Sequence, residues 1–151
     1  MIKLICVGKI KEKYLVDAIT EYQKRISKYT DIQIIELKDY NLDDINKSME
    51  LEKEQIEKYL DSKDYIVTLE IEGKEISSID FSKVIDRAYT SYSNISFIIG
   101  GSNGLSDRVK EKAKFHLSFS KMTFPHQLFR VLLLEQIFRA YKINNNERYH
   151  K

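Results

Sequence analysis

The sequence predicts one α/β domain, spanning residues 1–151, with a mostly parallel sheet and helices on both of its faces. Short apolar runs alternate along the chain with longer segments of helical periodicity, which is typical of such layered folds. The 151 residues suffice for a domain with its own core, so neither a disulfide nor a metal is needed to hold it together. Only five glycines and one proline occur, and no linker or internal repeat divides the chain.

The first half of the chain contains three predicted strands and two predicted helices. The strands are the apolar runs 2–7, 32–37 and 65–71, and the last is rich in β-branched residues. Residues 11–28 have the spacing of an amphipathic helix. The apolar face of this helix consists of Tyr14, Leu15, Ala18, Ile19, Tyr22 and Ile26. Residues 47–60 form a highly charged helix with fewer apolar members.

A helix and a strand follow in the third quarter. Residues 80–92 have helical spacing, and Ser78 or Asp80 is the candidate N-cap. Residues 95–99 are a continuous apolar run that ends abruptly at two glycines, as expected of a buried strand.

The last quarter contains a short helix, a short strand and a long helix. Residues 107–114 form the short helix, for which Ser106 is the candidate N-cap. Residues 115–119 form the fifth strand. Pro125 then suits the start of a helix, which runs to about residue 143.

The long helix, residues 126–143, is apolar around almost its whole circumference. Its apolar positions are 128, 129, 131–134, 137, 138, 140 and 141. One side can face the sheet of its own domain, and the other side then needs a partner. The pattern therefore predicts a homodimer built on this helix. The alternative is a central helix that is buried on all sides within a monomer.

Charge is unevenly distributed along the chain. Residues 1–75 contain 13 Lys/Arg and 17 Asp/Glu, a net charge of −4, whereas residues 76–151 contain 12 and 6, a net charge of +6. The asymmetry favours a polyanionic partner for the second half. The alternative is a mildly basic surface that has no partner.

Several features favour a cytoplasmic protein without metal or membrane contact. Cys6 is the only cysteine, so no internal disulfide forms, and no Cys/His cluster has zinc spacing. No apolar run approaches the ~20 residues of a membrane span. The N-terminal segment lacks the pattern of a signal peptide.

The carboxyl ends of the strands are the expected ligand site, because ligands of open parallel sheets bind there. The candidate positions follow Leu69, Ile99 and Phe119. The glycine-rich run 100–105 lies between a strand and a helix, where it either approaches a ligand closely or makes a tight turn. Its spacing fits neither the Rossmann fingerprint nor the P-loop.

Three motifs together are highly specific. They are Ile-Gly-Gly-x-x-Gly-Leu at 99–105, Leu-Ser-x-x-x-x-Thr-x-Pro-His at 117–126, and the ending Tyr149-His150-Lys151. With these motifs the chain resembles, over essentially its whole length, the ribosomal RNA large subunit methyltransferase H family. That family comprises the smallest SPOUT, or trefoil-knotted, methyltransferases.

The resemblance implies an S-adenosylmethionine-dependent enzyme that methylates N3 of a pseudouridine in large-subunit ribosomal RNA, on assembled ribosomes. It also implies a homodimer and a C-terminal trefoil knot, a feature that the rarity of knots argues against on pattern alone. A competing interpretation is a non-catalytic, ribosome-associated RNA-binding module. A third is a nucleotide-binding α/β enzyme of another chemistry, which the missing Rossmann and P-loop spacings disfavour.

Carried over residue by residue, the resemblance places the S-adenosylmethionine pocket at the three strand ends. Its residues would be Leu69, Gly100, Phe119, Ser120, Lys121, Met122, Thr123 and Phe124. Most contacts would come from backbone groups and apolar side chains.

The C-terminal tail is expected to supply the catalytic groups. His150 is the candidate acceptor for the N3 proton, because histidine titrates near neutral pH. Tyr149 is expected to stack on or hydrogen-bond the target base, and Arg130 and Lys151 to hold phosphates. We expect this tail to act on the cofactor of the partner protomer.

Overall fold

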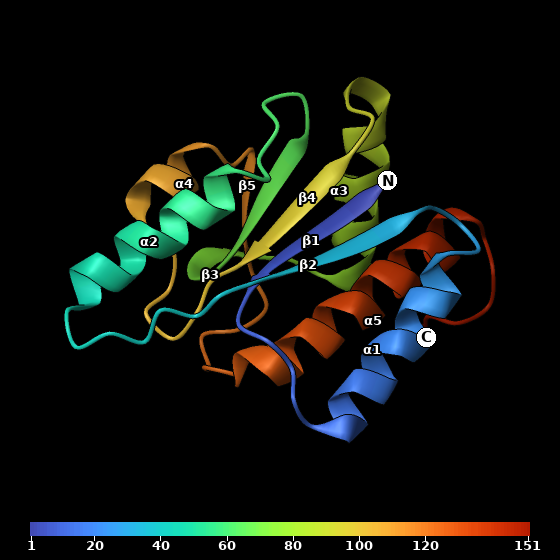
Figure 1. The fold of residues 1–151 in the computed structure, drawn as a ribbon. Helices are drawn as coiled ribbons and strands as arrows, with labels where there is room; N and C mark the ends of the chain where they lie inside the picture. The colour runs from blue at the N-terminus through green and yellow to red at the C-terminus, as the bar shows by residue number, and fades with distance from the viewer.

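The computed structural model describes residues 1–151 and contains one five-stranded sheet whose neighbouring strands are all parallel (Figure 1). The strands are β1 (Ile2–Val7), β2 (Ile32–Leu37), β3 (Tyr65–Glu75), β4 (Ile95–Ile99) and β5 (Phe115–Ser118). They lie in the order β2-β1-β4-β3-β5. The α/β class and the parallel sheet predicted from the sequence are confirmed.

Helices cover both faces of the sheet, as predicted (Figure 1). The helices are α1 (Lys13–Ile26), α2 (Ile45–Glu57), α3 (Ser78–Ser91), α4 (Asp107–Glu111) and α5 (His126–Asn144). Side chains alternate along a strand, so neighbouring residues enter opposite cores. Leu4 and Phe97 pack with α1, α3 and α5, whereas Ile5 and Ile98 pack with α2 and α4.

The bounds of several elements differ by a few residues from the sequence-based expectations, and α4 ends at Glu111 instead of residue 114. The N-cap of α3 is Ser77, whose side chain accepts a hydrogen bond from the Asp80 amide, so the expectation of Ser78 or Asp80 was wrong. β3 continues to Glu75 instead of ending at Ile71, because its pairing with β5 shifts register between Leu69 and Lys74. This bulge displaces residues 70–73 from the regular ladder, an arrangement that alternation of apolar residues does not reveal.

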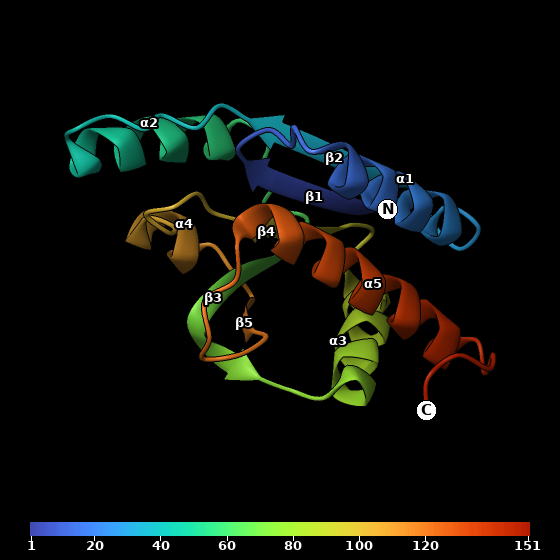
Figure 2. The ribbon, with the colours of Figure 1, turned by 90° about the horizontal axis from the view of Figure 1, so that it is seen from below.

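α5 packs between α1 and α3 (Figure 2). It buries one side of its surface. The buried members are Arg130, Leu133, Leu134, Ile137, Phe138, Ala140 and Tyr141. The opposite side carries Leu128, Leu132, Glu135 and Arg139, spaced i, i+4, i+7 and i+11, none of which is fully buried. We call these four residues the outer stripe. The helix is thus not covered on all sides by its own chain, and the homodimer stays a prediction.

None of the five helices combines the length and apolar character that crossing a bilayer requires. No group of three or more His, Cys, Asp or Glu side chains is arranged to hold a metal ion.

A buried carboxylate joins three strands at the end of the sheet opposite the strand termini expected to bind ligand. Asp64, 1% exposed, accepts hydrogen bonds from Lys3 (2.8 Å), Ser96 (2.9 Å) and Asn94 (3.1 Å). Burial acts to raise the pKa of Asp64, but the hydrogen bonds and the Lys3 charge outweigh burial and hold the pKa below its ordinary value.

Asp64→Asn is expected to destabilise the fold by about 1–3 kcal/mol, because it leaves buried donors without their charged acceptor. A carboxylate with a lowered folded pKa stabilises the protein above its unfolded pKa, and that contribution is lost as pH falls through the folded value. Urea unfolding at pH 7 and between pH 5 and 2 measures both effects. The exposed Asp86→Asn is the control. Equal stability of the two variants at pH 7 would contradict the assignment.

Candidate functional site

A pocket of about 380 Å³ opens at the carboxyl ends of β3, β4 and β5. This volume lies within the range of small-molecule sites. Its wall is formed by the β3 bulge, the glycine-rich run after β4, the segment after β5 and the first turn of α5. Parallel strands place these segments at one edge of the sheet, which explains why elements far apart in sequence share one cavity.

The glycine-rich run after β4 folds back on itself beside the pocket. Gly101 and Gly104 form an isolated bridge, and Gly104 has a φ of +76°, which favours glycine. A Cβ at Gly100 would lie 2.8 Å from the carbonyl carbon and oxygen of Gly104. The pocket wall at this point is therefore backbone, and no side chain can be added at Gly100 without moving it.

A buried carboxyl lies behind this run. Glu52 of α2 is 4% exposed, and its Oε1 would lie 3.5 Å from a Cβ at Gly101. Burial, followed by hydrogen bonding and charge repulsion with Asp39, raises the pKa of Glu52 to about 7. Near neutral pH this carboxyl is partly protonated, which lowers the penalty for burying it.

Aromatic rings shape the wall between β5 and α5. Phe119 meets Phe129 edge-on at 4.8 Å between ring centroids, and Phe124 stacks on Phe129 at 6.0 Å. The Ser118 hydroxyl lies within hydrogen-bond distance of the Ile71 carbonyl (2.9 Å) and the Ser120 carbonyl (3.1 Å). It thereby joins the β3 bulge to the segment that follows β5.

The bulge brings acidic side chains to the pocket. Glu70 and Glu72 line it, and Glu70 contacts Thr68 (2.6 Å), His116 and Lys110 (3.6 Å). Burial acts to raise the pKa of Glu70, but hydrogen bonds from Thr68 and His116 and the nearby positive charges hold the pKa below its ordinary value. Glu70 is thus anionic at neutral pH and gives this side of the pocket a negative charge.

The structure brings together seven of the eight expected cofactor residues. Those that line the pocket are Leu69, Gly100, Phe119, Ser120, Met122, Thr123 and Phe124. Lys121 belongs to the same segment but is exposed and does not line the pocket. Four residues with charged or titratable side chains also line the pocket, although they were not among the expected cofactor residues: Glu70, Glu72, Lys110 and His126. The pattern at 117–126 contained a signal only for His126.

The expectation that Arg130 contacts a phosphate was wrong. Arg130 is 1% exposed, and its guanidinium donates to Glu36 (2.7 Å) and to the Gly8 carbonyl (3.1 Å). It therefore holds the beginning of α5 against the ends of β1 and β2. His126, one turn earlier, lies beside Gly8 and lines the pocket, so Arg130 positions the pocket wall.

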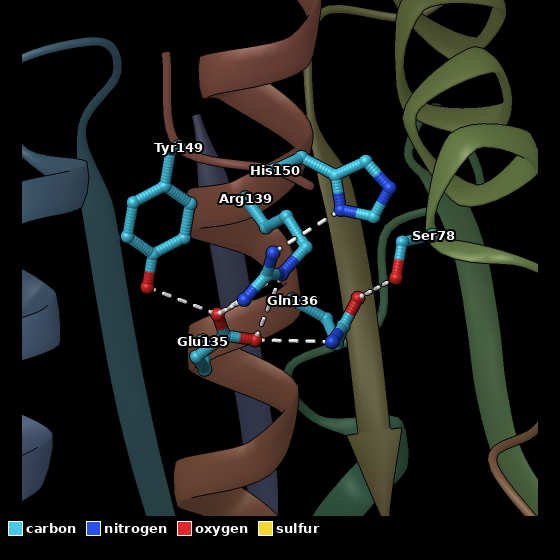
Figure 3. Close-up of polar contacts among 6 residues, drawn as sticks. All are labelled: Ser78, Glu135, Gln136, Arg139, Tyr149 and His150. Atoms are coloured by element: carbon cyan, nitrogen blue, oxygen red, sulfur yellow. Dashed lines mark hydrogen bonds and ion pairs between the residues drawn. The ribbon is translucent and has the colours of Figure 1, made fainter.

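The C-terminal tail lies away from the pocket of its own chain. Tyr149 and His150 contact Glu135 and Arg139 in the second half of α5 (Figure 3). The pocket meets α5 only at its first turn, through His126 and Phe129. Arg139 follows Phe129 by ten positions, or about 15 Å along a helix axis. One protomer therefore does not unite the tail with the pocket.

The pocket suits a flat molecule held by backbone, aromatic and a few charged groups, and it contains no serine–histidine or cysteine–histidine pair arranged for nucleophilic catalysis. Glu70 and Glu72 give it acidic groups that can face a cation. The Gly100 backbone allows a ligand to approach more closely than any side chain would.

Comparisons with known proteins agree over the whole chain. A family model described as "Predicted SPOUT methyltransferase" matches residues 1–150. A protein of Methanococcus vannielii is 55% identical, and the ribosomal RNA large subunit methyltransferase H of Clostridium botulinum is 52% identical, each over 99% of both chains. The structure of a probable methylase family protein from Haemophilus influenzae has a similar fold, with a TM-score of 0.56 and 13% identity over 99% of this chain and 70% of the other. The chain therefore belongs to the SPOUT methyltransferases, and within them to the ribosomal RNA large subunit methyltransferase H family.

Proposed function

We propose that this protein is an S-adenosylmethionine-dependent methyltransferase that modifies N3 of a pseudouridine in large-subunit ribosomal RNA, on assembled ribosomes. The observation that carries the proposal is the pocket at the ends of β3, β4 and β5, in a chain whose Clostridium botulinum relative is named for methylation of this RNA. Bound S-adenosylmethionine supplies a methyl group that is already activated on a sulfonium.

The residues present fit this cofactor. The pocket of about 380 Å³ is lined by Phe119, Phe124 and Phe129, against which an adenine ring can pack. Glu70 and Glu72 offer negative charge to the ammonium and sulfonium groups. The Gly100 backbone provides the close approach that a flat ring needs.

The chain's own contribution to the reaction is then the orientation of the two reactants. Holding two reactants in line lowers the activation free energy by several kcal/mol. Pocket residues from three strand ends hold the cofactor, and Arg130 and Glu36 hold the first turn of α5 beside it. The half-buried Tyr149 presents an aromatic face on which the target base can stack.

A homodimer through α5 completes the site. If two copies cross antiparallel at Leu132 and Glu135 of the outer stripe, Arg139 of each copy lies opposite Leu128 of the other. That arrangement carries the tail of one protomer to the pocket of its partner, which a single chain does not achieve. It also covers Leu128, which is 41% exposed in the isolated chain. The C-terminal trefoil knot and action in the cytoplasm belong to the same proposal.

Two measurements test the function. Isothermal titration with S-adenosylmethionine should show one site per protomer. Transfer of a labelled methyl group should then be compared on intact ribosomes, isolated large subunits and naked RNA, and the labelled nucleoside identified by mass spectrometry. We expect transfer to intact ribosomes and little to naked RNA. Cofactor binding without transfer to any of the three RNAs would contradict the enzymatic function.

The competing candidate is a non-catalytic, ribosome-associated RNA-binding module. This candidate also depends on the basic second half of the chain, which contains 12 Lys/Arg but only 6 Asp/Glu and could therefore bind the phosphates of RNA. It predicts salt-sensitive binding to ribosomes and no heat on titration with S-adenosylmethionine, so the first measurement separates the two.

A further inference from the structure

An ion pair in the outer stripe of α5 organises the C-terminal tail (Figure 3). Arg139 donates to Glu135 through Nη2 (2.6 Å) and Nε (3.1 Å), and both side chains are only about one-fifth exposed. Glu135 also accepts from Gln136 (3.0 Å), which in turn accepts from Ser78 of α3 (2.6 Å). The carboxylate is therefore fixed from two sides, and the guanidinium is fixed by the carboxylate.

The same pair holds Tyr149. The phenol hydroxyl donates to Glu135 Oε1 (3.0 Å), and the Arg139 guanidinium carbon lies 4.7 Å from the ring centroid. Phe138 meets the ring edge-on at 4.9 Å. Upstream, Glu147 is bonded to Lys142 (2.9 Å), so the tail is anchored on both sides of Arg148. The backbone that carries the next residue thus has a defined place.

His150 is bound to Arg139 through one particular ring nitrogen. Nη1 of Arg139 lies 3.1 Å from Nδ1 of His150. A guanidinium has donors only, so Nδ1 must present its lone pair. The imidazole is then neutral with its hydrogen on Nε2. If both ring nitrogens were protonated, the Nδ1–H of His150 would point at the N–H of Arg139, and no hydrogen bond could form. The His150 side chain is exposed, and its free polar atom is a hydrogen-bond donor.

We propose, on the basis of the function proposed above, that Glu135 and Arg139 are positioning residues that present His150 as an Nε2–H donor to a carbonyl oxygen of the target base. When the N3–H bond breaks, the proton passes to solvent water and the electron pair left on N3 forms the bond to the methyl carbon. The bond between that carbon and the sulfonium sulfur would break at the same time, and its electron pair would stay on the sulfur, which leaves as a neutral thioether. Negative charge meanwhile spreads to the two carbonyl oxygens that flank N3. A fixed donor at one of them stabilises that charge.

This role differs from the proton acceptor expected of His150 from the sequence. In this arrangement the Nδ1 lone pair is occupied by Arg139 and Nε2 carries a hydrogen, so neither nitrogen is free to take the N3 proton. The two roles predict different results when His150 is replaced. The N–H of a glutamine side-chain amide can take over the role of a hydrogen-bond donor, but it cannot take over the role of a base.

The tautomer is measured by ¹⁵N NMR of the imidazoles in the full-length protein, without cofactor or RNA. Only three histidines occur, and a His150→Gln sample assigns the missing signals. We expect one dominant Nε2–H tautomer in the native protein. Arg139→Met, which keeps the aliphatic stem but removes the donors, should give a mixture. The control is Arg25→Met, which breaks a similar i, i+4 pair with Glu21 beside Phe138. An unchanged tautomer in Arg139→Met would overturn the proposal.

Kinetics test the functional part. Arg139→Met should lower kcat for methyl transfer by about a hundredfold, as for loss of a fixed donor, with unchanged affinity for S-adenosylmethionine. His150→Gln should retain at least about ten times the kcat of His150→Ala, because the amide donates but does not accept a proton. Equal kcat values for these two variants would overturn the donor role. Because the tautomer is observed without cofactor, failure of the native protein to bind S-adenosylmethionine would instead count against the proposed function.

Discussion

Replacing Gly100 with alanine is expected to lower the affinity for S-adenosylmethionine by about a hundredfold, or ~2.8 kcal/mol. The new Cβ would lie 2.8 Å from the backbone of Gly104 and 3.0 Å from Leu105 Cδ2. The Gly104 atoms belong to the backbone and cannot move aside as the end of a side chain can, so the whole run must shift. The shift moves the wall of the pocket at the end of β4.

Isothermal titration measures this loss, and thermal unfolding shows whether the variant is folded. Asn103→Ala is the matched control, because Asn103 is only partly buried, belongs to the same run and does not line the pocket. We expect the control to bind with native affinity. Native affinity in Gly100→Ala would show that the cofactor is bound elsewhere.

Mixed dimers are expected to recover activity that both parent variants lack. A chain that lacks residues 149–151 has a pocket but no tail, and a Gly100→Ala chain has a tail but a defective pocket. The tail-deleted chain alone should lose methyl transfer by at least about a hundredfold, because it lacks the donor that the tail supplies. The Gly100→Ala chain alone should lose it by about a hundredfold at S-adenosylmethionine concentrations below the native Kd, because its affinity falls by that factor. The tail and the pocket of one chain lie about 15 Å apart along α5, so they must combine across the dimer. Mixed in equal amounts, they should regain about a quarter of native activity, since random pairing makes half the dimers mixed and each mixed dimer has one complete site.

The measurement is methyl transfer to ribosomes after the two variants are co-expressed or re-mixed. Different tags then allow the mixed dimer to be purified, and the purified mixed dimer should have about half of native activity, because one of its two sites is complete. Co-expression of the tail-deleted chain with itself is the control. If the tail acted on its own chain, the mixed dimer would contain no complete site and would stay inactive. That outcome would contradict the arrangement proposed for α5.

The location of the pocket was predictable from the sequence, because it requires only that the strands be parallel and depends little on their order in the sheet. Any open parallel sheet places the carboxyl ends of its strands at one edge, so the positions after Leu69, Ile99 and Phe119 had to lie near one another. The acidic side of the pocket was not predictable. Glu70 and Glu72 lie at the β3 bulge, and the alternation of apolar residues does not show where a bulge inserts extra residues.

The structural role of Arg130 was not predictable from the sequence either. An arginine in a basic, aromatic segment predicts a phosphate contact equally well whether it is exposed or buried. Its partners, Glu36 and the Gly8 carbonyl, are 94 and 122 residues away. No local pattern indicates such long-range pairs, and only the packing of α5 against the ends of β1 and β2 turns this cation inward.

Periodicity and three short motifs were sufficient to predict the α/β class, the order of the elements and the family, because hydrophobic spacing is a property of each segment by itself. The side of α5 that stays uncovered, the burial of Arg130 and the attachment of His150 to Arg139 emerged only from the folded chain. Each of these features depends on contacts between separate segments of the chain. The geometry with which those segments pack decides which groups meet, and the local spacing of residues does not contain that information.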